Sequence, residues 1–138
     1  MLRFVLLAVP LAVLVLALAT FAADSAGLGP DLAPLEARGL ANSAGLPRGV
    51  GAAALVFEGI ALAALYLLIE GRFDRWWLDG LAAGLAAWLF RGPILVLAVA
   101  ALVRVPTAPI WEMARVALFA DPAATLAVAA LARTSRPR

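Results

Sequence analysis

The chain has 138 residues, of which 65% are hydrophobic and only 14% are charged, and its mean hydropathy is +1.01. Soluble domains carry about 25% charged residues, so a water-soluble fold of this length could not cover so much apolar surface. We therefore expect an all-α integral membrane protein, a single membrane domain in which about four transmembrane helices form a small bundle. The lipid bilayer is then the first partner of the chain.

The residue types that are missing limit the chemistry of the chain. All 11 basic residues are arginine, and histidine and cysteine are absent from the sequence. The chain thus lacks the usual ligands of haem, zinc and iron–sulfur clusters and the imidazole base of catalytic triads, so we expect no cofactor, metal or catalytic residue. The net charge of +2 is scattered rather than gathered into a basic stripe, which argues against a nucleic-acid partner.

The first predicted span covers residues 4–23, an apolar run that is interrupted only by Pro10. About 20 such residues cross a hydrocarbon layer about 30 Å thick. The alternative is a cleaved signal peptide in residues 1–22, because Thr20 and Ala22 are small residues at the two positions that a signal peptidase reads. The run exceeds the usual signal-peptide core of about 7 to 15 residues, which favours a retained span.

Residues 24–49 are rich in glycine and proline and are predicted to form an extracytoplasmic loop. Residues 31–38 could form a short amphipathic turn with Leu32 and Leu35 against the lipid interface, or a loosely ordered connector. Residues 50–69 form the second predicted span, which carries one charge, Glu58.

A charged connector then leads to the third predicted span, residues 80–103. Trp76 and Trp77 mark the membrane–water interface, where amphipathic rings settle. The same span contains Arg91, and next to it Gly92 and Pro93. Proline lacks the N–H that would continue the helical hydrogen bonds, so a kink is expected at these two residues.

The last predicted span covers residues 110–132, with Trp111 as a further interface anchor. This stretch can also be interpreted as two pieces, in which residues 108–120 lie on the surface and Asp121 caps a new helix with Pro122 at its first position. The second piece would then measure about 16 Å, too short to cross a bilayer, so we favour one tilted or kinked span.

The arginines near the predicted spans indicate an orientation. Cytoplasmic amino and carboxyl termini follow from the excess of arginine on one side of the membrane. Six lie on the side assigned to the cytoplasm (Arg3, Arg72, Arg75, Arg133, Arg136 and Arg138) and four on the other (Arg38, Arg48, Arg104 and Arg115). The alanine- and arginine-rich usage is associated with GC-rich bacterial genomes, so the expected location is a bacterial inner membrane.

Glu58 and Arg91 are the candidate functional residues. They lie equally far along the chain from the centre of the connector between the second and third spans, so an antiparallel hairpin brings them to the same depth. Charges at that depth are costly, which predicts an intramembrane ion pair. Gly80 and Gly84 form a small-xxx-small motif that should let these two helices approach closely. The pair can lock the hairpin, or Glu58 can bind a proton or cation.

These features leave three classes of function. The first is a non-catalytic accessory or scaffolding subunit of a larger membrane complex, whose partners are other subunits. The second is a small transporter or ion-conducting protein, a homo-oligomer in which Glu58 exchanges a proton beside Arg91. The third is an enzyme acting on lipid, but the carboxylates of the charged connector lack the spacing of a catalytic motif. The accessory subunit is the favoured prediction.

Overall fold

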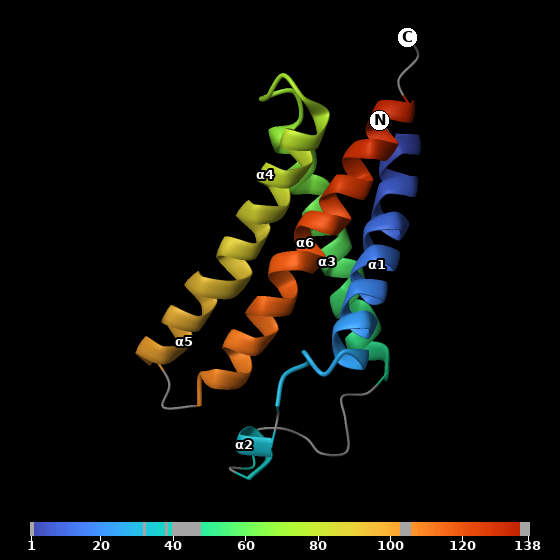
Figure 1. Ribbon diagram of the computed structural model, residues 1–138. Helices are drawn as coiled ribbons and strands as arrows, with labels where there is room; N and C mark the ends of the chain where they lie inside the picture. Colours follow the sequence, from blue (N-terminus) through green and yellow to red (C-terminus); the bar gives the residue numbers. More distant parts are fainter. Residues whose placement is uncertain (1, 32, 38, 40–47, 103–105, 136–138) are drawn as a thin grey trace.

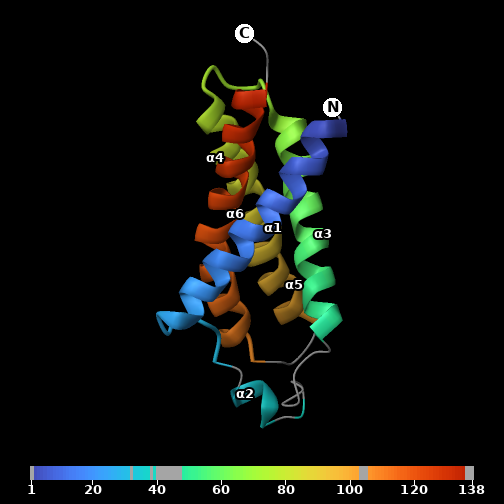
Figure 2. The ribbon, with the colours of Figure 1, turned by 90° about the vertical axis from the view of Figure 1, so that its right-hand side faces the viewer.

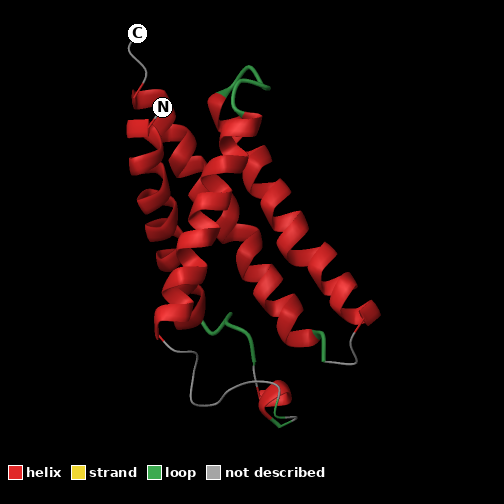
Figure 3. Ribbon diagram, turned by 180° about the vertical axis from the view of Figure 1, so that it is seen from behind, coloured by secondary structure: helices red, strands yellow, loops and turns green. Residues whose placement is uncertain are grey.

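The computed structural model describes residues 2–31, 33–37, 39, 48–102 and 106–135. All regular structure within these residues is helical (Figures 1 and 3). Four stretches are long and apolar enough to cross a membrane. They are α1 (Leu2–Ser25), α3 (Arg48–Ile69), the run of α4 (Trp76–Leu89), η1 (Phe90–Ile94) and α5 (Leu95–Leu102), and α6 (Ala108–Ser135). The all-helical fold expected from the sequence is confirmed, and the four helices fit a multi-pass membrane protein.

The helices alternate in direction along the bundle. The start of α1, the end of α6 and the connector between α3 and α4 lie at one end (Figures 1 and 2). The single turn α2 (Ala33–Glu36) lies beyond the opposite end, which we call the loop end. Leu32 and Arg38 of the predicted amphipathic turn lie outside the described residues. The described part of this loop is tied to α6, because the main-chain N–H of Asp31 donates to Glu112 at 2.7 Å.

Helix α6 is the central element of the bundle. In its most apolar part, 18 residues long, half of the residues are buried, whereas 11% to 22% are buried in the corresponding parts of the other three stretches. It packs mainly against α4 and α1, and also against η1 and α3. Its alanines allow this, because small side chains let backbones approach closely. The buried core comprises Ala8, Ala12, Leu16, Leu62, Ala63, Tyr66, Ala83, Ala120, Ala124, Val128, Ala129 and Ala132.

The two glycines of the small-xxx-small motif contact α6. A Cβ on Gly84 would overlap the backbone of Pro122, and a Cβ on Gly80 would stand 3.0 Å from the Cβ of Ala129. The sequence predicts that these glycines contact α3 across the hairpin, whereas the structure places them against α6. Two helices approach closely where small residues line both surfaces, and the alanine-rich surface of α6 is the one that meets these glycines.

The last apolar stretch is one continuous helix, as the favoured interpretation predicted, and not two pieces. Helix α6 continues from Ala108 to Ser135 with Pro122 inside it, so Asp121 does not cap the start of a helix. The Thr125 hydroxyl donates instead to the main-chain carbonyl of Asp121 at 2.9 Å, one turn back. In the third stretch, Gly92 and Pro93 lie in the π-helical turn η1, a wider turn that accommodates an irregular hydrogen-bond pattern. A kink at these residues stays a prediction.

Candidate functional site

Three charged side chains from three helices meet near the middle of the bundle. Glu58 lies halfway along α3, Asp121 halfway along α6, and Arg91 in η1 close to the middle of the third stretch. The guanidinium Nη1 of Arg91 forms an ion pair with the carboxylate of Glu58 and lies 3.3 Å from Oδ1 of Asp121. We call these three residues the polar cluster. The structure thus brings the two predicted residues together and adds a third.

The members of the polar cluster differ in burial. The Asp121 side chain is 1% exposed, that of Glu58 18%, and that of Arg91 47%. The second carboxylate oxygen of Asp121, Oδ2, is buried and accepts no hydrogen bond from any residue that the structure describes. One guanidinium nitrogen therefore serves two carboxylates, each through a single oxygen.

The spacing of the sequence also points to Asp121. Arg91 precedes Pro106 by as many residues as Asp121 follows it, so a second antiparallel hairpin brings Asp121 to the depth of Arg91. This is the same symmetry that predicted the pair of Glu58 and Arg91. The adjacent Pro122 also allows a helix start at Asp121, and that alternative would place the carboxylate at the end of a helix rather than in the middle of a span.

A hydrogen bond between helices holds the end of α4, next to η1, against α6 beside the polar cluster. The indole Nε1 of Trp88 donates to the main-chain carbonyl of Ala114 at 2.8 Å. Gly92 lies under the same contact, since a Cβ there would stand 3.1 Å from the Cβ of Ala114 and 3.1 Å from Nε1 of Trp88. The absence of a side chain at Gly92 lets the backbone that carries Arg91 approach α6.

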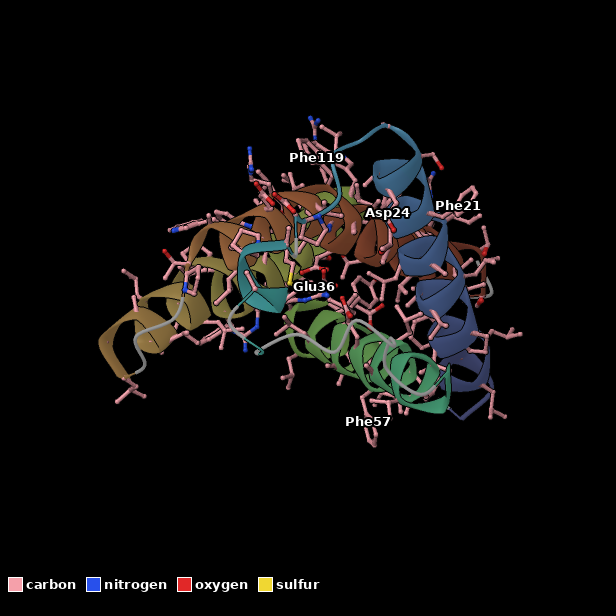
Figure 4. The ribbon with its side chains drawn as sticks, turned by 90° about the horizontal axis from the view of Figure 1, so that it is seen from below. Phe21, Asp24, Glu36, Phe57 and Phe119 are labelled. Carbon is pink, nitrogen blue, oxygen red and sulfur yellow. The ribbon has the colours of Figure 1, made fainter. Side chains whose placement is uncertain are left out.

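Two hollows meet at Arg91. The first, which we call the loop-side cavity, has a volume of about 190 Å³. Its polar lining residues are Thr20, Asp24 and Arg91, and the rest of its lining is apolar (Leu16, Pro30, Met113, Val116, Ala117 and Ala120). Figure 4, seen from the loop end, shows Asp24 on the inner side of α1, whereas Phe21 and Phe57 point outward. Water can enter a hollow of this size and polarity from the loop end.

The second hollow is a groove of about 500 Å³ between α3 and α4, which we call the lateral groove. Its walls are apolar side chains such as Leu65 and Phe90, and the three residues of the polar cluster lie at its base. The lateral groove opens on the outer surface of the bundle. Arg91 is common to the loop-side cavity and to the lateral groove, so its guanidinium stands between them.

The predicted interface anchors lie at the two ends of the bundle. Trp76 and Trp77 begin α4, and Trp111 lies in the first turn of α6 at the loop end. The ring of Trp76 also lies 5.6 Å from the guanidinium carbon of Arg133, a cation–π contact that joins the start of α4 to the end of α6. Their role as membrane anchors stays a prediction.

No protein-family model, curated protein or solved structure matches this chain. Function must therefore be inferred from the polar cluster and its surroundings. Among the described residues no three or more acidic side chains gather as they would around a metal ion. What the polar cluster can do is fix three helices to one another, bind a partner that covers Arg91, or exchange a small cation such as a proton.

Proposed function

We propose that this chain is a non-catalytic accessory or scaffolding subunit of a larger complex in a bacterial inner membrane, with both termini in the cytoplasm. One observation carries the proposal. The Arg91 side chain is 47% exposed although it lies near the middle of a helix long enough to cross the bilayer. A charge at that depth costs about 2.5 to 3.5 kcal/mol on insertion scales, and a partner helix seated over Arg91 would remove much of this cost.

The surface beside Arg91 has the composition of a contact between helices. Gly51, Ala54 and Ala61 lie on the same side of α3 as Glu58, and all three are exposed in the isolated chain. Helices in membranes associate through such small residues, because hydrophobic burial gives no advantage where lipid is equally apolar. Together with the lateral groove they offer a partner helix a close fit over the polar cluster.

Helix α5 supports the proposal in a second way. It projects away from the other helices toward the loop end, and of the described elements it packs substantially only against η1 (Figure 1). Leu97 and Leu102 are 65% and 83% exposed. Because lipid can also cover an apolar helix, the exposure of α5 does not by itself show that a partner is present. Helix α5 nevertheless lies beside the half-exposed Arg91 and offers a partner helix a surface to pack against.

The experiment that tests this proposal is the mass and composition of the native particle. The tagged chain is produced in its own host, extracted in a mild detergent and weighed by light scattering with correction for detergent. A particle with other chains in a fixed ratio supports the proposal. A particle that contains this chain alone, as a monomer or as a homo-oligomer, contradicts it.

A matched pair of substitutions locates the contact. Ala61→Trp fills the lateral groove with an indole, while Ala123→Trp adds the same side chain at an exposed position of α6 outside the lining of that groove. If the partner sits over the polar cluster, Ala61→Trp releases the chain from the particle and Ala123→Trp does not. Equal retention of both variants would remove the lateral groove as the contact surface.

A small oligomeric transporter or ion-conducting protein that uses Glu58 and Arg91 is the second candidate. It is favoured by one observation, the position of Arg91 between the loop-side cavity and the lateral groove. Proton flux of the purified chain in liposomes, followed with an enclosed pH-sensitive dye, tests it. Flux should disappear in Glu58→Gln and persist in Glu112→Gln, which alters a carboxylate near the loop end. Absence of flux in the unaltered oligomer would exclude this candidate.

A further inference from the structure

Asp121 is the most buried charged residue of the polar cluster, and its pairing is incomplete. Its side chain is 1% exposed, and Oδ1 lies 3.3 Å from Nη1 of Arg91. Oδ2 is buried without a hydrogen bond from any described residue. A buried ionised carboxylate is strongly disfavoured unless both of its oxygens are compensated, so the ionised form of Asp121 is poorly solvated here.

The charges that surround Asp121 do not balance it. From η1 it faces Arg91, and from α3 Arg91 is approached by Glu58, which pairs with the same Nη1. The charged residue of α1 on this side is Asp24, which lines the loop-side cavity and adds no positive charge. In α4 the carboxylate is Asp79, near the other end of the helix, where it accepts hydrogen bonds from main-chain N–H groups of the connector. One positive charge thus faces two carboxylates, and the polar cluster carries a net charge of −1 when both are ionised.

We propose that Asp121 is a proton-binding site, at which Oδ2 takes up a proton from water and returns it to water. On uptake an O–H bond of a hydronium ion breaks and leaves water, an O–H bond forms at Oδ2, and the carboxylate becomes neutral. On release the O–H bond at Oδ2 breaks and a water molecule takes the proton as hydronium. Nothing is oxidised or reduced. Glu58 retains the guanidinium of Arg91 in the protonated state, so the polar cluster is then neutral and every charge within it has an opposite charge as neighbour. This inference does not depend on the identity of a partner subunit.

The loop-side cavity supplies a route for the proton. Its volume of about 190 Å³ has room for several water molecules, each of which occupies about 30 Å³ in the liquid. Thr20 and Asp24 give those waters polar neighbours, and Arg91, which contacts Asp121, belongs to the same lining. A small displacement of the guanidinium away from Oδ1 would connect the water to Asp121. Arg91 therefore acts as the barrier between the water and the proton site.

Infrared spectroscopy of the whole chain in lipid nanodiscs tests the proposal. A protonated carboxyl group has a C=O stretching band that is separate from the bands of ionised carboxylates and moves on transfer to D₂O. We expect this band at neutral pH, a shift of the band when the chain is made with ¹³C-aspartate, and its loss in Asp121→Asn. Asp79→Asn, which alters another buried aspartate, should keep it.

The alternative results would overturn the proposal. A band that shifts with ¹³C-glutamate rather than with ¹³C-aspartate would assign the proton to a glutamate such as Glu58. Absence of the band from mildly acidic to mildly alkaline pH, together with a melting temperature that rises with sodium concentration, would make Asp121 a metal-cation site instead. The isotope shift is measured on the unaltered chain, so the result stands even if Asp121→Asn fails to fold.

Discussion

Gly84 of α4 lies directly against Pro122 of α6, with no room for a side chain between the two backbones. Pro122 has no N–H to donate to the carbonyl of Leu118 one turn earlier, so a turn that lacks one hydrogen bond is packed against a residue that has no side chain. This contact sets the separation of α4 and α6, and with it the reach of Arg91 to Asp121.

Gly84→Ala is expected to destabilise the bundle by about 1 to 3 kcal/mol, because the added methyl group must force the two backbones apart. The matched control is Gly51→Ala, at a helical glycine where an added Cβ meets nothing within 4 Å. That control should be neutral or slightly stabilising, since alanine is the better helix former by about 1 kcal/mol. Thermal melting in detergent measures both. Equal melting temperatures for the two variants would contradict the close contact.

The three charges of the polar cluster predict an order of severity among variants. Arg91→Gln leaves the ionised Glu58 without a positive partner and should cost about 3 kcal/mol or more. Glu58→Gln should cost much less, because Asp121 can release its proton and become the counter-ion of Arg91. The double variant Glu58→Gln with Arg91→Gln should recover much of the loss, because a protonated Asp121 leaves no uncompensated charge in the polar cluster. Equilibrium unfolding in mixed micelles, followed by tryptophan fluorescence, ranks the variants.

Arg115→Gln is the control for that series. Its side chain is 71% exposed and its nearest carboxylate oxygen, on Glu112, is 3.5 Å away, so its loss should change stability by less than about 1 kcal/mol. If Arg91→Gln and Arg115→Gln cost the same, the polar cluster contributes nothing to the stability of the fold.

The first helix should be retained in the mature protein. Ala8, Ala12 and Leu16 are at most 1% exposed and pack in the core, so cleavage after residue 22 would open the core from α3 to α6. Intact-mass spectrometry of protein purified from the membrane should give the mass of the chain with residues 1–22 present. A mass that corresponds to a start near residue 23 would show instead that the segment is a signal peptide.

The orientation can be tested without removing any cysteine, because the chain contains none. Ser135→Cys, at the end of α6, should react with a membrane-impermeant maleimide only after the cytoplasmic side is exposed. Ser25→Cys, at the end of α1, should react in intact spheroplasts. Both serines are exposed in the bundle, so burial will not mask either site. The reverse pattern of labelling would invert the predicted topology.

The order of the helices was predictable because each long helix can be recognised from its composition alone. An apolar run of about 20 residues bounded by glycine, proline or charge is recognisable whatever it packs against. The contact of Glu58 with Arg91 was accessible for a similar reason. Two helices joined by a short connector must run antiparallel, so residues equally far from the connector reach the same depth.

The neighbour of each helix face was decided only by the tertiary structure. Gly80 and Gly84 allow any helix to approach, and their spacing does not say that the partner is α6 rather than α3. An aspartate followed by a proline, such as Asp121 and Pro122, can begin a helix. These two residues lie inside α6 instead, because the neighbouring helices that pack against α6 hold it together across a proline that would end an isolated helix. The sequence by itself determined the number, length and direction of the helices, which depend on local hydropathy. Which faces meet depends on the rotation of each helix about its own axis, which no local pattern records. The spacing of the sequence places Asp121 at the depth of Arg91, but only the tertiary structure shows that the two side chains face each other.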